Sequence, residues 1–283
     1  MEYLIPSTKD EAVSMLDKYG EAAVIIAGGV FFTPHKEELF SEAEVLIDIG
    51  KLGLSYINAD EKGLKIGATT SLTSLMTSKV INKGVYRVLA ETVEQIPIQR
   101  IRDMGTVGGE VCMSAETDLP ISLMALDAKV VLSSTKSRIM SLDEFYTGYL
   151  STALEPNEMV TEVQLPLFPP KTGAGFCKFE RGTVDLPIVN AAARVTLGAD
   201  GKCSAAKVVL GCVTFPPVIA DNAAKLLIGK NLDEKIIESA AETAADMECI
   251  TDIRASGELR QTWIKVAVRK ALNKAYEQAK GGK

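Results

Sequence analysis

The chain has 283 residues, of which 47% are hydrophobic and 24% charged, and its formal net charge is −6. This balance is typical of a folded protein of about two domains and excludes a disordered chain. The acidic charge provides no global basic field, so we expect no nucleic-acid partner. The first residues do not resemble a secretory signal, and no apolar run is long enough to cross a bilayer, so no integral membrane segment is expected.

The first fifty or so residues predict a small α/β unit. A short strand at 3–5 is followed by a helix that ends at Gly20. Two buried strands are then expected, at 22–27 and 45–49, with a polar loop between them.

The stretch from 56 to 166 predicts a second unit of strands and helices. Its helices are expected from residue 71 onwards, at 85–96 and at 118–126, and its strands at 64–68, 128–132, 138–142 and 158–166. The run Pro166-Leu-Phe-Pro-Pro170 follows, and it is the strongest candidate for a domain boundary because prolines stop both helices and strand ladders.

The remainder, 171–283, predicts antiparallel strands followed by three helices. The strands are expected at 175–180, 191–197 and 207–213, and the helices near 218–228, 234–247 and 258–278. In the last helix, apolar residues recur with helical spacing from Ile264 to Ala275, which indicates one buried face. Trp263 lies beside that face and is expected to pack there.

Two glycine pairs, each after an apolar run that reads as a strand, are the most informative feature of the chain. Gly28-Gly29 follows residues 22–26, and Gly108-Gly109 comes soon after 98–103. Glycine lets the backbone come close to a ligand and permits positive φ, so that successive N–H groups can converge on an anion. Two such turns could hold the two phosphates of a dinucleotide from opposite sides. The turns are not a Rossmann fingerprint, because the G-x-G-x-x-G spacing is missing and the residues after Gly29 do not read as a helix start.

The chain offers few side chains for catalysis. Its one histidine, His35, lies in a polar loop and is expected to be a surface residue. The five cysteines are widely spaced, which argues against disulfides, zinc or an iron–sulfur cluster held by this chain and favours a reducing cytoplasm. We therefore expect no catalytic side chain and no metal ligand, and any chemistry would come from a cofactor.

A series of motifs in a fixed order covers nearly the whole chain. The motifs are Ala27-Gly28-Gly29, Leu46-Ile-Asp-Ile49, Ile66-Gly-Ala68, Ile101-Arg-x-Met-Gly-Thr-Val-Gly-Gly109, Asp118-Leu-Pro120, Lys178-x-x-Arg181-x-x-x-Asp185, Gly211–Val218 and Asp252-Ile-Arg-Ala-Ser256. Through these motifs the chain resembles the FAD-binding medium subunit of molybdenum-containing hydroxylases, of the xanthine dehydrogenase and carbon monoxide dehydrogenase type.

The resemblance implies an α+β fold. Two small α/β FAD-binding subdomains, 1–55 and 56–166, would precede a C-terminal domain of antiparallel sheet plus helices, 171–283, with FAD between them. The cofactor-binding residues that it implies are Ile25, Ile26, Ala27, Gly28, Gly29, Val30, Phe31, Phe32, Ile96, Thr106, Val107, Gly108, Gly109, Glu110, Asp118, Val160 and Lys178.

The resemblance also implies roles for these residues. Residues 25–32 would wrap the pyrophosphate mainly through backbone N–H groups, and 106–110 would close on it from the other side, with the Thr106 hydroxyl as a donor. Ile96 would line the flavin pocket, Asp118 would lie near the ribityl or adenosine portion, and Val160 beside a ring. Lys178 would lie near the isoalloxazine edge, where a positive charge would stabilise reduced, anionic flavin.

In such a complex, a molybdenum-cofactor subunit and a [2Fe-2S] subunit would supply electrons to the FAD, which would reduce NAD⁺ or another acceptor. Two alternatives stay open at this point. The first is an FAD-free scaffold subunit, suggested by Val30, Phe31 and Glu110, which depart from the family pattern. The second is a stand-alone flavin oxidoreductase.

Overall fold

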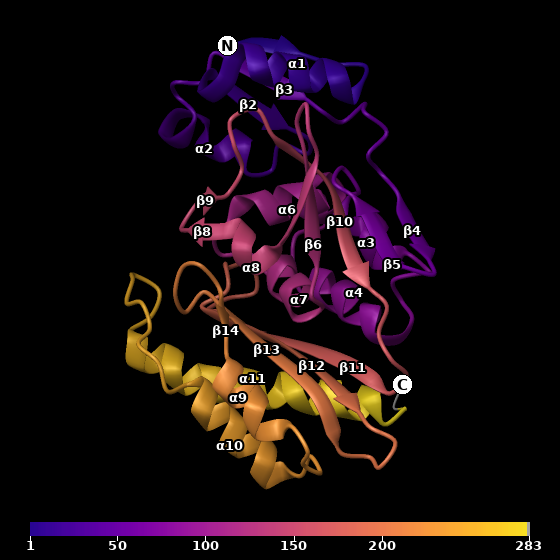
Figure 1. Ribbon diagram of the computed structural model, residues 1–283. Coiled ribbons are helices and arrows are strands. Elements are labelled where there is room, and N and C mark those ends of the chain that lie inside the picture. The colour runs from indigo at the N-terminus through magenta and orange to yellow at the C-terminus, as the bar shows by residue number, and fades with distance from the viewer. Residues whose placement is uncertain (282–283) are drawn as a thin grey trace.

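Three main sheets, each with its own helices, follow one another along the long axis of the molecule in the computed structural model, which describes residues 1–281 (Figure 1). The predicted fold class, α+β, is confirmed. No sheet crosses the limits 1–55, 56–166 and 171–283, so we propose these limits for the three parts. None of the helices in the described part of the chain could span a membrane.

The N-terminal part is a three-stranded parallel sheet in the order β1-β3-β2, with helices beside it. Its elements are β1 (Glu2–Leu4), α1 (Lys9–Tyr19), the 3-10 turn η1 (Gly20–Ala22), β2 (Ala23–Ile26), α2 (Phe32–Leu39) and β3 (Val45–Asp48). Thr8 caps α1 by accepting a hydrogen bond from the Glu11 N–H, and Gly20 ends the helix at φ +53°. Ala12, Val13 and Leu16 of α1 are buried in the core of this part.

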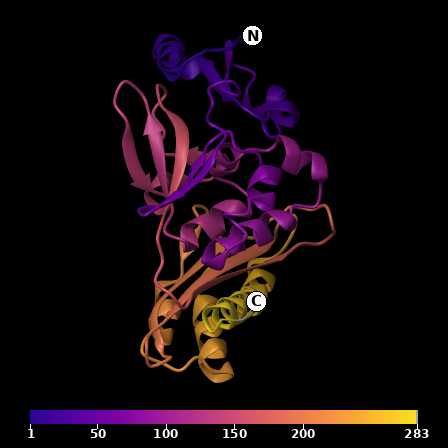
Figure 2. The same cartoon turned by 90° about the vertical axis from the view of Figure 1, so that its right-hand side faces the viewer.

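The middle part is a five-stranded antiparallel sheet in the order β4-β5-β10-β6-β7, with its helices on one side (Figure 2). Its strands are β4 (Ile57–Asp60), β5 (Gly63–Gly67), β6 (Lys129–Ser133), β7 (Arg138–Ser141) and β10 (Met159–Pro166), with the small pair β8 (Tyr146–Gly148) and β9 (Ser151–Thr152). Its helices are α3 (Leu72–Thr77), η2 (Gly84–Tyr86), α4 (Arg87–Glu94), α5 (Gln99–Met104), α6 (Val107–Met113), α7 (Leu119–Ala125) and α8 (Leu142–Phe145).

The C-terminal part is an antiparallel sheet, β11-β12-β13-β14, covered by helices. Its elements are β11 (Thr172–Phe179), β12 (Val189–Leu197), β13 (Cys203–Gly211), β14 (Val218–Ile219), α9 (Asp221–Leu227), α10 (Glu234–Ala244) and α11 (Gly257–Ala279). The predicted apolar face of α11 is fully buried against this sheet. Gly173 and Gly175 permit the contact, because a Cβ at either would lie within 2.3 Å of an α11 carbonyl oxygen. Trp263 packs on Phe179 with ring centroids 5.4 Å apart.

Three local predictions were wrong, all in short segments around the glycine pairs. Residues 98–103, expected to be strand-like, lie mostly in α5, because six residues are too few for periodicity to separate helix from strand. The expected polar loop after Gly29 contains α2, whose Pro34 is tolerated in the first turn, where N–H groups lack intrahelical partners. The second glycine pair belongs to the first turn of α6 and is not a bend after a strand.

Candidate cofactor site

The first glycine pair, far away in sequence, is brought by the fold against the segment that leads to the second pair. A Cβ at Gly28 would lie 1.7 Å from the carbonyl oxygen of Met104, two residues before Thr106. A side chain at Gly28 is therefore incompatible with the observed approach of the two segments. The β2–α2 turn and the start of α6 form one continuous surface as a result.

The first turn presents four successive backbone N–H groups without an acceptor. These belong to Gly28, Gly29, Val30 and Phe31, which find no hydrogen-bond acceptor within residues 1–281 and are half-buried. Gly29 has φ +69°, and Thr33 bonds back to the Gly29 carbonyl through both its N–H (3.0 Å) and its hydroxyl (2.8 Å). Consecutive free N–H groups at a glycine turn that leads into a helix are a site for an anion such as a diphosphate.

The second turn offers a hydroxyl group instead of free N–H groups. Thr106 caps α6 by accepting a hydrogen bond from the Gly109 N–H at 3.1 Å, which leaves its own hydroxyl hydrogen free to donate. The N–H groups of Val107 and Gly108 already donate to the carbonyls of Thr70 and Ala68. Close packing also explains Gly108, because a Cβ there would lie 2.9 Å from Ala68.

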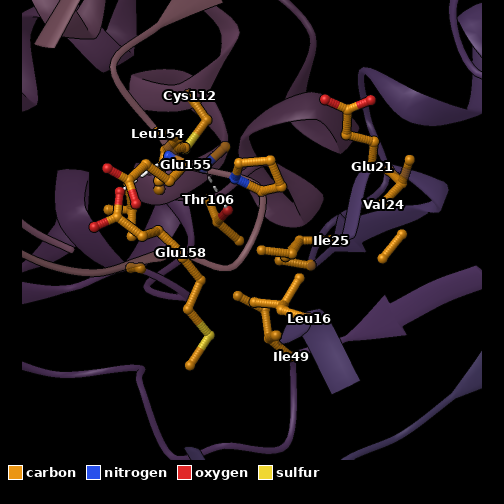
Figure 3. A pocket seen from close by; sticks show the side chains of 18 of the residues that line it. Leu16, Glu21, Val24, Ile25, Ile49, Thr106, Cys112, Leu154, Glu155 and Glu158 are labelled. Carbon is orange, nitrogen blue, oxygen red and sulfur yellow. Dashed lines mark hydrogen bonds between the residues drawn. The ribbon is translucent and has the colours of Figure 1, made fainter. Parts of the chain in front are cut away.

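Two cavities meet at these turns. The first, called here the Leu16 cavity, has a volume of about 470 Å³ and lies between side chains such as Leu16 and Ile49 of the N-terminal part and Leu154 and Glu158 of the middle part (Figure 3). The second, the Phe31 cavity, measures about 480 Å³. Both are lined by Val24, Ile25, Ala27, Thr106, Gly109 and Cys112. Two connected spaces of this size fit the two halves of a dinucleotide, with the diphosphate at the turns.

Most of the site residues expected from the sequence line these cavities. The Leu16 cavity is lined by Ile25, Ala27, Thr106, Gly108, Gly109 and Val160. The Phe31 cavity is lined by Ile25, Ile26, Ala27, Gly28, Gly29, Val30, Phe31, Phe32, Thr106, Gly109 and Glu110. Four expected residues line neither cavity: Ile96, Val107, Asp118 and Lys178. Ile96 and Val107 are buried in the core of the middle part.

Asp118 and Lys178 form a buried ion pair between the middle and C-terminal parts. Lys178 Nζ lies 3.2 Å from Asp118 Oδ2 and 2.8 Å from Glu180 Oε2, and Asn190 donates to Asp118 Oδ1 at 2.8 Å. Burial disfavours the charged lysine, but the two carboxylates outweigh it and raise the pKa of Lys178. Burial also raises the pKa of Asp118, against the effects of Lys178 and Asn190.

Glu110 is a carboxyl group in the wall of the Phe31 cavity. It lies in the first turn of α6, directly after Gly109, and its side chain makes no hydrogen bond or ion pair with any described residue. Burial raises the pKa of Glu110 to about 8, and the charge of Asp118 adds to this while Lys178 opposes it. The carboxyl is therefore mostly protonated at neutral pH.

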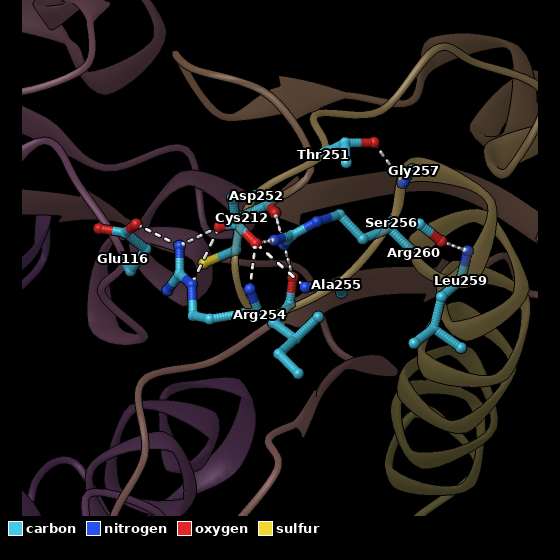
Figure 4. Close-up of polar contacts among 11 residues, drawn as sticks. Glu116, Cys212, Thr251, Asp252, Arg254, Ala255, Ser256, Gly257, Leu259 and Arg260 are labelled. Atoms are coloured by element: carbon cyan, nitrogen blue, oxygen red, sulfur yellow. Dashed lines mark hydrogen bonds and ion pairs between the residues drawn. The ribbon is translucent and has the colours of Figure 1, made fainter.

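A polar network holds the loop that precedes Asp118 (Figure 4). Arg254 bridges Glu116 in that loop to Asp252 in the C-terminal part. Arg260, which is fully buried, donates to Asp252 Oδ1 at 2.6 Å and to the carbonyls of Ile188 and Cys212. Burial opposes ionisation of Asp252, but hydrogen bonds from Arg254 and backbone N–H groups hold its pKa below its usual value.

The sequence reasoning missed Cys112, Leu150 and Phe40, which line the Phe31 cavity. Recognition of Thr106 as a helix cap would have placed Cys112 one turn after Gly108 on α6. Burial raises the pKa of Cys112 to about 12, so its thiol is neutral. Within residues 1–281, no cluster of side chains could hold a metal ion.

Comparisons with protein families match the chain on both sides of the proline boundary. Residues 1–168 match the family described as "FAD binding domain in molybdopterin dehydrogenase", and 174–275 match the "CO dehydrogenase flavoprotein C-terminal domain".

The chain is also similar to curated proteins along its whole length. It is 31% identical to the 6-hydroxypseudooxynicotine dehydrogenase complex subunit alpha of Paenarthrobacter nicotinovorans, over 99% of this chain and 95% of that protein. It is 31% identical to the carbon monoxide dehydrogenase medium chain of Afipia carboxidovorans, over 99% of this chain and 98% of that protein.

Solved structures are also similar to the chain along its whole length. A carbon monoxide dehydrogenase from Hydrogenophaga pseudoflava contains a chain that superimposes with a TM-score of 0.93 at 29% identity, over 98% of both chains. A chain of quinoline 2-oxidoreductase from Pseudomonas putida 86 gives 0.91 at 28% identity, over 99% of this chain and 98% of that one.

Proposed function

Because the chain belongs to the FAD-binding family of molybdopterin dehydrogenases, as an FAD-binding medium subunit of a molybdenum hydroxylase complex, we propose that it relays electrons within that complex. Electrons would arrive from iron–sulfur clusters on a [2Fe-2S] subunit and leave to NAD⁺ or another acceptor. Substrate oxidation would take place on a molybdenum-cofactor subunit.

The observation that carries this proposal is the pair of turns in contact. The free N–H groups from Gly28 to Phe31 would hold the pyrophosphate of FAD, and the Thr106 hydroxyl would donate to it from α6. All seventeen residues named for the site in the sequence analysis remain our proposal for the FAD environment. When bound, FAD supplies the redox chemistry, since a flavin exchanges electrons with donors and acceptors.

The electrostatics of the site suit a relay. The buried Lys178 stays charged because Asp118 and Glu180 flank it, and a fixed cation stabilises negative charge that develops nearby. His35 and Cys112 are poor candidates for acid–base catalysis on an organic substrate. His35 bonds the Phe31 carbonyl through Nδ1 and stacks on the Phe31 ring, and the Cys112 thiol is neutral.

The partners and the compartment are part of the same proposal. The names of the relatives, such as "complex subunit alpha" and "medium chain", describe parts of larger enzymes, which supports an assembly with molybdenum and iron–sulfur subunits. The five cysteines are all free, which supports a reducing cytoplasm.

The test is to load the purified chain with FAD and measure its reactions with and without the partner subunits. We expect the isolated chain to bind FAD and to oxidise no organic substrate of the complex, whereas addition of the partner subunits and substrate should reduce its flavin. Turnover of an organic substrate by the isolated chain would favour a stand-alone flavin oxidoreductase. A flavin that stays oxidised in the complete complex would contradict the relay.

A further inference from the structure

Glu110 contributes a carboxyl group to the wall of the cavity at which we propose that the diphosphate binds. It lines the Phe31 cavity together with the four free N–H groups of the first turn, and it follows Gly109 directly in α6. A diphosphate carries two negative charges, and an ionised carboxylate in the same partly buried cavity would repel it. The site therefore contains one group that opposes its proposed ligand unless the group is neutral.

The surroundings provide no spare cation for Glu110. Lys178 is the nearby positive charge, and its Nζ already forms ion pairs with Asp118 at 3.2 Å and with Glu180 at 2.8 Å. Three carboxyl groups thus share one buried lysine, and the unpaired one is Glu110. The walls that β2 and α2 contribute to the cavity are apolar side chains and backbone.

Several titratable groups lie around Glu110 on the packed elements. They are Cys112 on α6, Asp118 at the start of α7, Tyr146 on β8, Lys178 on β11 and Glu180, which pairs with that lysine. On α2, His35 stacks on Phe31, which lines the same cavity. The Tyr146 hydroxyl is buried and unpartnered within residues 1–281, and burial raises its pKa well above its usual value. Cys112, Tyr146 and Lys178 all have raised pKa values, so none of them loses a proton in the mildly alkaline range.

We infer that Glu110 is neutral when FAD is bound, so that FAD binding under alkaline conditions takes up the proton that this carboxyl has lost in the free chain. The neutral carboxyl admits the diphosphate and can donate a hydrogen bond into the cavity, whereas the carboxylate would have to be protonated first. This inference rests on the proposed placement of FAD at the two turns, and it adds a pH dependence to the affinity.

The direction of the effect follows from linkage. With a pKa of about 8 in the free chain, Glu110 is already protonated at lower pH, and the affinity is then independent of pH. Above about pH 8 the free chain loses that proton while the complex keeps it, so the dissociation constant for FAD should rise toward about tenfold per pH unit. At about pH 8.5, roughly three quarters of a proton should be taken up for each FAD bound.

The experiment is isothermal titration of FAD into the apo full-length chain between about pH 6.5 and about pH 9.5, repeated in buffers of different ionisation enthalpy. We expect proton uptake and the pH slope in the wild type, and neither in Glu110→Gln. The matched control is Glu61→Gln, which removes the same charge from an exposed position in the turn between β4 and β5, outside both cavities, and should keep both effects.

The wild-type measurement stands on its own if Glu110→Gln fails to fold. A wild-type chain that binds FAD with no proton uptake, or a Glu110→Gln chain that keeps the slope, would overturn the inference and leave the proposed function intact. If the wild type failed to bind FAD at any pH, both the inference and the proposed function would be overturned. That result differs from FAD binding whose affinity does not change with pH.

Discussion

The contact between the two turns makes a specific prediction for Gly28→Ala. The added Cβ would lie 1.7 Å from the Met104 carbonyl oxygen, whereas ordinary contact begins at 3.4 Å, so the two segments must separate by the difference. Both contacting groups are backbone, and no side chain can rotate away to relieve the overlap. The N–H groups of the first turn would then move out of hydrogen-bonding range of a ligand that also contacts α6.

The magnitude follows from the number of hydrogen bonds affected. Loss of two hydrogen bonds to a charged phosphate costs about 3–6 kcal/mol, so FAD affinity should fall by at least about a hundredfold. Overpacking should also destabilise the apo chain by about 1–3 kcal/mol, which lowers Tm by roughly 3–10 °C. Calorimetric titration with FAD and a thermal melt of the apo chain measure the two effects separately.

Gly182→Ala is the matched control for this prediction. It makes the same chemical change, but its Cβ would meet only Asp185 Oδ2 at 3.7 Å, and its φ is not in the left-handed region. We expect it to leave FAD affinity unchanged. If Gly28→Ala bound FAD within about twofold of the control, the inference that the two turns must touch to hold the diphosphate would be refuted.

Two further predictions concern the charged groups around the site. Arg260→Met should lower the free energy of unfolding by about 3–5 kcal/mol in urea, because it leaves two buried carbonyls without their donor and removes one of the two arginines that pair with Asp252. Arg269→Met, from an exposed ion pair, should cost less than about 1 kcal/mol, and equal effects of the two substitutions would contradict this. Lys178→Met should lower the flavin reduction potential by about 20–40 mV, and Glu180→Gln should raise it. Potentiometric titration of the FAD-loaded chain measures both shifts. If the two variants shifted the potential in the same direction, an electrostatic role of Lys178 would be excluded.

The regular parts of the fold could be predicted because their signals are local. The Thr8 cap and the Gly20 end fix α1, and the apolar face that includes Ile264 is long enough for its period to be unambiguous. The helices at the site were harder to predict, because α5 has only six residues and α6 only seven, and helices this short depend on tertiary contacts. The predictions from sequence were wrong in these two segments and in α2, which has eight residues.

The geometry of the site depends on contacts that a sequence does not display. Lys178 could be named from a resemblance, but its two carboxylate partners lie just before α7 and just after β11. The availability of N–H groups is also a tertiary property. The N–H groups of Val107 and Gly108 donate to the carbonyls of Thr70 and Ala68, whereas the N–H groups of the first turn have no acceptor within residues 1–281.

The proposed way of holding a diphosphate explains why the composition of the chain indicates no anion site. Among described residues, neither the Leu16 cavity nor the Phe31 cavity is lined by a lysine or arginine, while four glutamates do line them: Glu21, Glu110, Glu155 and Glu158. In the proposed site, favourable interactions with a diphosphate would come from backbone dipoles and one hydroxyl, which add nothing to a count of charged residues. A site built from dipoles in an acidic environment is sensitive to the ionisation of its own carboxyl groups, and Glu110 is the one that lies nearest to the turns in sequence.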